Sequence, residues 1–228
     1  MHFLCLHGKD MNSKVAFFFF PWLRIPRLPA AIRYELGGDH TYDFVEGSVP
    51  CGQNISGDEV FAYCDVHQLQ STLQAVCDLE QYIQAYGPYD AVFGFSLGAA
   101  IALACLIYHY ETKDENTRPP VKLAVFFSTP VMVYDYKAFH QGRIRRLEVD
   151  DIGRVVDIPT AHIWSSGEDS VIEKYGPFEY GELATQVCKP DRLSVYIHDQ
   201  GHIIPNSTED VVGIGKVINR AIVLAGGL

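Results

Sequence analysis

The stretch Ala91-Val-Phe-Gly-Phe-Ser-Leu-Gly-Ala-Ala100 decides the fold, because it joins two apolar segments through a turn of small residues. Residues 91–95 predict a buried strand, and residues 97–110 predict a largely apolar helix. Between them, the five residues from Gly94 to Gly98 match the pattern G-x-S-x-G, in which a serine occupies a tight strand-to-helix turn. We therefore predict that Ser96 stands clear of the sheet at a helix N-terminus, where negative charge is favoured.

Apolar runs alternate with helical patterns along the rest of the chain. Leucine, valine and isoleucine recur at helical spacing over residues 67–86, and Gly87-Pro88 ends that pattern. A closing helix is predicted over residues 210–224. Further strands are predicted over residues 3–6, 41–46, 122–128, 158–164 and 193–198. Such strands separated by helices are typical of a parallel sheet covered on both faces. The predicted fold is a single α/β domain spanning residues 1–228, with residues 52–64 as a loop and 134–157 as a helical insertion.

The overall composition excludes the collagenous, disordered and membrane classes of protein. The chain has 228 residues, of which 48% are hydrophobic and 20% charged, as in globular proteins. A formal charge of −10 argues against a nucleic-acid partner, which needs concentrated Lys and Arg. The six cysteines form no C-x-x-C pair, and the chain is too long to need disulfides. With no evident signal peptide, we expect a reduced, cytoplasmic setting.

The segment that begins Val15-Ala-Phe-Phe-Phe-Phe-Pro-Trp-Leu23 is unusually apolar. It is shorter than a membrane span, and prolines at positions 21, 26 and 29 interrupt it, so we predict no transmembrane helix. Residues 16–29 are interpreted as an insertion. The alternatives are a hydrophobic lid and an intron translated by mistake in the gene model.

A serine hydroxyl is a weak nucleophile near neutral pH, so Ser96 needs an adjacent base, which in turn needs an orienting acid. At nucleophile turns of this kind the partners follow in the order serine, acid, histidine. His202 lies just past the last predicted strand and is the favoured base. His198 ends that strand and is expected to point to the flank of the sheet or to solvent.

The acid is predicted at the end of the strand at 158–164, where Ser165-Ser-Gly-Glu-Asp169 follows. Asp169 is favoured over its neighbour Glu168, because a glycine, one further residue and then an aspartate at such a strand end favour the aspartate as the acid. Asp157 precedes the strand, and Asp199 lies too close to His202 in the sequence. Both are interpreted as surface or turn residues.

Two backbone N–H groups are needed to stabilise the oxyanion that forms when a serine attacks a carbonyl. The first is expected from Leu97, directly after the nucleophile. The second is expected from Lys9, in the loop His7-Gly8-Lys9 after the first strand, where His7 shapes the loop. No metal-ligand spacing and no phosphate-binding loop is visible in the sequence, so we expect neither a metal nor a cofactor.

Four motifs together resemble the fungal serine hydrolase family of the α/β-hydrolase superfamily. They are Phe3-Leu-Cys-Leu-His-Gly8, Gly94-Phe-Ser-Leu-Gly-Ala99, Gly167-Glu-Asp169 and Gly201-His-Ile-Ile-Pro205. The resemblance implies a small cytosolic hydrolase with Ser96, Asp169 and His202 as its triad. It also implies action on esters or thioesters, because the family includes stand-alone thioesterases that release polyketide chains from a synthase's carrier domain.

The chain departs from this family at residues 16–29. The flanking sequences, residues 12–14 and 30–36, look like two parts of one helix beside the oxyanion loop. Our expected function is hydrolysis of a thioester or ester with a hydrophobic, polyketide-like acyl chain in fungal secondary metabolism. The carrier domain of a polyketide synthase is the expected partner. The alternatives are a carboxylesterase acting on small free esters and a non-catalytic α/β-hydrolase that serves as a binding protein.

Overall fold

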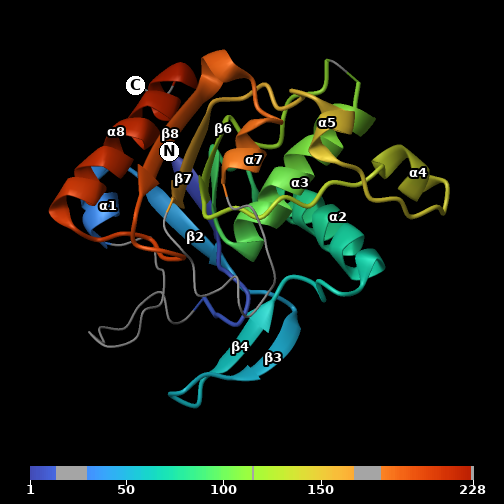
Figure 1. Ribbon diagram of the computed structural model, residues 1–228, viewed down its shortest axis with the longest axis horizontal. Helices are drawn as coiled ribbons and strands as arrows, with labels where there is room; N and C mark the ends of the chain where they lie inside the picture. Colours follow the sequence, from blue (N-terminus) through green and yellow to red (C-terminus); the bar gives the residue numbers. More distant parts are fainter. Residues whose placement is uncertain (14–29, 115, 167–180, 227–228) are drawn as a thin grey trace.

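The computed structural model describes residues 1–13, 30–114, 116–166 and 181–226, so the apolar insertion predicted at 16–29 lies outside the described residues (Figure 1). A six-stranded sheet has the strand order β2-β1-β5-β6-β7-β8, and every neighbouring pair is parallel. Its strands are β1 (His2–Leu6), β2 (Thr41–Val45), β5 (Ala91–Phe95), β6 (Leu123–Phe127), β7 (Thr160–Ser165) and β8 (Leu193–His198). The predicted parallel α/β fold is confirmed.

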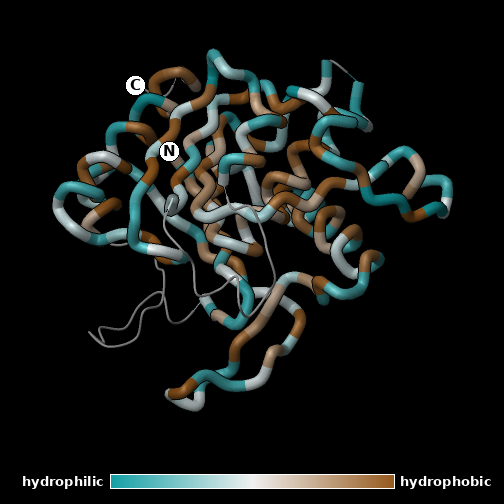
Figure 2. The backbone as a smooth tube through the Cα atoms, in the orientation of Figure 1, coloured by the Kyte–Doolittle hydropathy of each residue, from teal (hydrophilic) through white to brown (hydrophobic). Residues whose placement is uncertain are grey.

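Helices cover both faces of this sheet (Figure 1). Alternate residues of the strands enter two separate cores, so that Leu4 packs with one cluster and Phe3 with the other. The Leu4 core contains side chains of α2 (Leu69–Tyr86) and α3 (Leu97–Thr112). The Phe3 core contains side chains of α1 (Ala30–Glu35) and α8 (Thr208–Leu224). The apolar centre of the sheet is visible in Figure 2.

Helix α3, which follows the nucleophile turn, is apolar on every side, and this explains its central, buried position. All thirteen residues from Leu97 to His109 are buried. It contacts β5 and α2, and it also contacts α4 (Tyr136–His140). A helix with no polar face is stable only when neighbours surround it, so the sheet and these helices hold α3 in a fixed position.

The prediction that residues 52–64 form a loop is wrong. An antiparallel hairpin covers most of this region, made of β3 (Val49–Gln53) and β4 (Glu59–Ala62). The Asn54 Oδ1 atom accepts hydrogen bonds from the N–H groups of Ser56 and Asp58, which closes the turn between the strands. Of the residues that indicated a loop, Gly57 and Asp58 belong to this turn, whereas Gly52 lies in β3 at a shift of register. The hairpin projects from the main sheet beyond the end of β2 (Figure 1).

Residues 134–157, predicted as a helical insertion, are largely irregular and contain two short helices, α4 and α5 (Val149–Ile152). The chain also forms α7 (Glu182–Thr185) and the 3₁₀ helix η2 (Pro190–Arg192) before β8.

All six cysteines are free thiols. Within the described ranges, no helix is both long and apolar enough to cross a membrane.

Residues 12 and 13 are not part of a helix, contrary to the expectation that they continue into residues 30–36. Met11 instead forms a bridge with Phe61 of β4, and the Asn12 side chain donates a hydrogen bond to the Glu59 carbonyl at 2.6 Å. This pairing with the hairpin gives the backbone N–H and carbonyl groups of Met11 hydrogen-bond partners in an extended conformation. The second part of the expectation is correct in that α1 begins at Ala30.

Candidate active site

Ser96 occupies a strained turn between β5 and α3. Its backbone has φ +52° and ψ −119°, in the left-handed half of conformational space that a residue with a side chain rarely adopts. The Ser96 N–H donates to the Phe127 carbonyl at 2.9 Å, and its own carbonyl accepts from Ala100 in the first turn of α3. These bonds hold the strained residue and leave the side chain at the carboxyl end of the sheet.

The two glycines of the motif are required by close approach of neighbouring backbone. A Cβ atom added to Gly94 would lie 2.4 Å from the Ala99 Cα atom. A Cβ atom added to Gly98 would lie 2.5 Å from the His7 carbonyl oxygen. Neither obstacle is the flexible end of a side chain. The spacing G-x-S-x-G thus allows α3 to turn back onto β5 and to pack directly against the end of β1.

The structure brings Ser96 and His202 together. The His202 Nε2 atom lies 2.9 Å from the Ser96 Oγ atom, within hydrogen-bond distance. For Nε2 to accept the hydroxyl proton it must be the unprotonated nitrogen, which assigns the ring proton to Nδ1. The Phe95 ring lies beside the imidazole, with centroids 5.0 Å apart. This arrangement is that of a nucleophile and its general base.

The two candidate acids, Asp169 and Glu168, lie outside the described residues, so the assignment of Asp169 stays a prediction. The described chain that leads to them ends close to the histidine loop. The Ser165 Oγ atom accepts from the Gly201 N–H at 3.0 Å, and the Ser166 N–H donates to the His198 carbonyl. Ser165 and Ser166 at the end of β7 therefore lie beside the loop that carries His202.

The excluded candidates have other partners. Asp157 forms an ion pair with the Arg192 Nε atom at 2.9 Å, and it lies before β7, at the opposite end of that strand from Ser165. His198 is buried, and its Nδ1 atom accepts from the Gln200 N–H at 3.2 Å. Burial also lowers the pKa of His198 below its ordinary value. His198 thus supports the His202 loop as a neutral side chain, through its hydrogen bond from Gln200.

A buried carboxylate, Asp210, holds the other side of the His202 loop and was not singled out from the sequence. It accepts hydrogen bonds from the side chains of Tyr196, Gln200 and Ser207. Burial raises the pKa of Asp210, but these three bonds outweigh burial, so its pKa lies below the ordinary value. Residues 200 and 207 flank the loop, so one carboxylate at the start of α8 fastens both of its ends.

The predicted oxyanion donors lie in the two segments that meet at the nucleophile. Leu97 begins α3, and the first N–H groups of a helix have no partner within that helix. Lys9 lies in the turn directly after β1, whose residue Leu6 is in register with Gly94 of β5. Both positions suit their predicted roles, which remain predictions.

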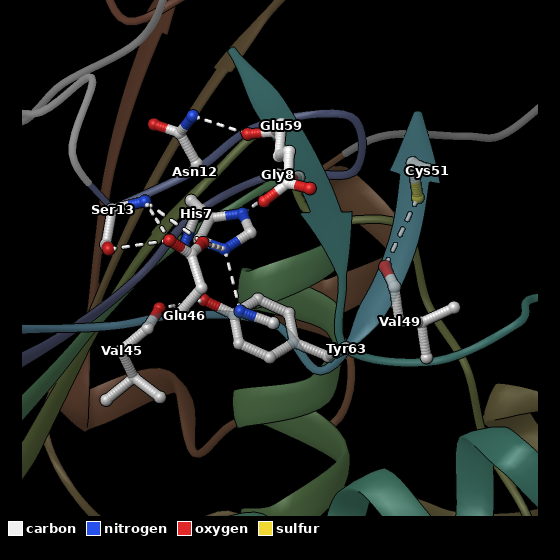
Figure 3. Close-up of polar contacts among 11 residues, drawn as sticks. His7, Gly8, Asn12, Ser13, Val45, Glu46, Val49, Cys51, Glu59 and Tyr63 are labelled. Carbon is white, nitrogen blue, oxygen red and sulfur yellow. Dashed lines mark hydrogen bonds and ion pairs between the residues drawn. The ribbon is translucent and has the colours of Figure 1, made fainter. Parts of the chain in front are cut away.

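His7 has the geometry of a residue that shapes this loop (Figure 3). Its Nδ1 atom lies 2.7 Å from the Gly8 carbonyl, which can only accept, so Nδ1 carries the proton. Its Nε2 atom accepts from the Gly47 N–H at 3.0 Å. In the part of the chain that is described, no group of three His, Cys, Asp or Glu side chains is placed to hold a metal ion.

Known proteins resemble this chain in sequence and in fold. The sequence model of the family described as Serine hydrolase (FSH1) matches residues 32–214. The chain belongs to this serine hydrolase family. The predicted resemblance is confirmed, and the protein is a hydrolytic enzyme. The serine hydrolase is 31% identical to the Esterase FPY3 of Fusarium mangiferae over 237 residues, which cover 98% of this chain and 99% of that protein.

Solved structures show the same fold at low sequence identity. A carboxylesterase from Mesorhizobium loti matches with a TM-score of 0.59 and 14% identity, covering 96% of this chain and 88% of that one. The acyl-protein thioesterase 2 of Zea mays matches with a TM-score of 0.55 and 15% identity, covering 97% and 93%. These similarities place the serine hydrolase in the α/β-hydrolase fold and say nothing about its substrate.

Proposed function

We propose that the protein is a stand-alone thioesterase that hydrolyses acyl thioesters or esters and releases a polyketide-like acyl chain from a carrier domain. The observation that carries the catalytic part is the 2.9 Å contact between Ser96 Oγ and His202 Nε2 on the strained turn. The resemblance to fungal thioesterases supports the acyl substrate. A relative that carries the name esterase supports cleavage of an ester-type bond.

In the proposed reaction, Ser96 Oγ attacks the acyl carbonyl carbon while His202 Nε2 takes the hydroxyl proton. The carbonyl oxygen becomes an oxyanion, which the N–H groups of Leu97 and Lys9 stabilise. His202 then gives its proton to the leaving thiol or alcohol, and the acyl chain remains on Ser96. Water, deprotonated by His202, attacks the acyl-enzyme, and His202 returns this proton to Ser96 Oγ as the carboxylic acid leaves. Asp169 is assigned the task of fixing the imidazole tautomer.

The catalytic assignment is tested by Ser96→Ala. We expect hydrolysis of an activated acyl ester to fall by about 10³-fold or more, because the nucleophile is lost. Ser194→Ala is a matched control, because it removes a buried hydroxyl on β8 that has no hydrogen-bond partner among the described atoms. An unchanged rate in a folded Ser96→Ala protein contradicts the assignment.

The leaving group is tested with matched acyl N-acetylcysteamine thioesters and ethyl esters across a range of chain lengths. A thioesterase is expected to favour long thioesters, and a higher kcat/KM for short oxygen esters instead supports the carboxylesterase alternative. Presentation of the same acyl chain on a phosphopantetheinyl carrier domain is expected to raise kcat/KM at least about tenfold, which corresponds to about 1.4 kcal/mol of recognition. Equal values for carrier-bound and free thioesters contradict the carrier partner.

A further inference from the structure

The loop that contains the predicted donor Lys9 is held from two sides by residues distant in the sequence (Figure 3). We call residues 7–13, which follow β1, the oxyanion loop. Strand β4 pairs with its middle, where the Phe61 N–H donates to the Met11 carbonyl at 2.7 Å. The end of β2 provides the second support, through Val45, Glu46 and Gly47. The projecting hairpin therefore contacts the loop directly.

Tyr63 connects both supports to the start of the loop. Its hydroxyl accepts a hydrogen bond from the His7 N–H at 2.9 Å and donates to the Val45 carbonyl at 2.8 Å. Its ring lies against the His7 imidazole, with centroids 4.8 Å apart. Burial raises the pKa of Tyr63 well above its ordinary value, so the hydroxyl keeps the proton that it donates. One hydroxyl thus satisfies two backbone groups at the sheet edge.

Glu46 holds Ser13, the last residue of the same loop. Its carboxylate accepts from the Ser13 N–H at 3.0 Å and from the Ser13 hydroxyl at 2.8 Å. One of its oxygens also lies 3.0 Å from the His7 Nε2 atom, but this nitrogen accepts from the Gly47 N–H, so no hydrogen bond joins the two. Since Glu46 directly follows β2, its carboxylate fastens the Ser13 end of the oxyanion loop to the end of that strand.

The loop in turn touches the nucleophile turn without space for adjustment. The His7 carbonyl packs against Gly98, where an added Cβ would lie 2.5 Å away. Gly8 packs against the ring of Phe95, where an added Cβ would lie 3.0 Å from the ring and from the Met11 sulfur. A shift of the loop by a few tenths of an ångström therefore changes where its N–H groups point relative to Ser96.

We propose that Tyr63 and Glu46 are positioning residues for acyl transfer, which hold the oxyanion loop so that its N–H donor faces the developing oxyanion. This inference rests on the proposed function. Donors stabilise a transition state only when they are fixed in advance at about hydrogen-bond distance from the oxyanion. Apolar packing alone holds a backbone less specifically than a network in which each polar group is satisfied. The bonds to His7 and Ser13 form such a network.

The test compares Tyr63→Phe and Glu46→Ala with the wild type on an activated acyl ester. Rates are normalised to the sites that react with a fluorophosphonate, so that unfolded protein does not contribute. We expect kcat to fall about 10- to 100-fold, less than the loss of an entire donor, while KM changes by less than about twofold. The inhibition constant of an alkyl boronic acid, which forms a tetrahedral adduct on serine, is expected to rise by the same factor as kcat/KM falls.

Three further variants separate positioning from general damage. Tyr42→Phe removes a buried hydroxyl that has no hydrogen-bond partner among the described atoms, and Glu80→Ala removes a carboxylate paired with Lys113. Both are expected to keep wild-type kcat and boronate affinity. Glu46→Gln keeps an oxygen that accepts from Ser13, so it is expected to restore most of the activity lost in Glu46→Ala.

The outcomes distinguish this inference from the function on which it rests. If Tyr63→Phe and Glu46→Ala match their controls in kcat and boronate affinity while the wild type is active, the positioning roles are wrong and the hydrolase stands. The roles are also wrong if KM alone rises, because that result indicates ground-state binding. A wild-type protein that hydrolyses neither ester nor thioester overturns both proposals.

Discussion

The Nε2 atom of His202 lies 2.9 Å from the Oγ atom of Ser96, although 106 residues separate the two in the sequence. Parallel strands explain this meeting, because the carboxyl ends of β5 and β8 open onto the same edge of the sheet. Each residue is fixed by its own support. Ser96 is held by the Phe127 carbonyl, and the His202 loop is held by Asp210.

Of the two histidines near the end of β8, one is expected to be essential for kcat and the other is not. His202→Ala removes the general base, so we expect kcat to fall about 10³-fold or more. His198→Asn keeps a side-chain acceptor for the Gln200 N–H, so kcat is expected to stay within about threefold of the wild type. Steady-state kinetics of both variants on one acyl ester make the measurement. A larger loss in His198→Asn would exchange the two roles.

The acid predicted from the sequence is tested by Asp169→Asn. The neutral amide cannot stabilise the imidazolium that forms at His202, and we expect kcat to fall about 10³- to 10⁴-fold. Glu168→Gln changes the neighbouring carboxyl in the same way and is expected to retain kcat within a few-fold. If the losses are reversed, Glu168 is the acid.

The close approach of α3 to β1 predicts a strong effect of Gly98→Ala. The added methyl group would lie 2.5 Å from the His7 carbonyl oxygen, so one of the two backbones must move. We expect the free energy of unfolding to decrease by about 1–3 kcal/mol, with a loss of kcat because the oxyanion loop shifts. Gly38→Ala, which meets no atom within 4 Å, is the control. Urea unfolding and kinetics measure both effects.

Asp210 predicts how stability changes in acid. Its native pKa lies below the ordinary 3.8, so its ionised form contributes stability that is fully present above pH 3.8 and is lost as the pH falls through the native pKa. Asp210→Asn weakens bonds to a charged acceptor and is expected to lower the free energy of unfolding at pH 7 by about 1–3 kcal/mol.

The difference between wild type and Asp210→Asn should therefore shrink as the pH is lowered below about 4. Urea unfolding at a series of pH values gives this curve. Asp199→Asn, which changes an exposed carboxylate in the same loop, is expected to follow the wild type throughout. A difference that is constant with pH would show that folding leaves the pKa of Asp210 unchanged.

The central sheet and the nucleophile turn were predictable because their signals are local. The strand at 91–95, the motif around Ser96 and the helix after it occur in one continuous stretch, and glycine spacing reports a steric need. His202 was found because strand order brings late loops to the same edge. In these cases a short pattern carries the structural information.

The supports of the site were not predictable for the opposite reason. Tyr63 contacts His7 across 56 residues, and Glu46 contacts Ser13 across 33 residues. No periodicity links such positions, because each depends on where the hairpin docks. The hairpin itself was mistaken for a loop, since its strands are short and β4 has just two buried residues, Val60 and Ala62. Tertiary contact decides such segments.

The bonds between Ser13 and Glu46 also bear on how this chain tolerates changes of length. Ser13 is fixed to the end of β2, and α1, which begins at Ala30, packs through buried Ile32 in the core shared with α8. Two fixed anchor points thus lie on either side of residues 14–29. A change of length between these two positions would leave the Ser13–Glu46 bonds and the packing of Ile32 with the partners they have now.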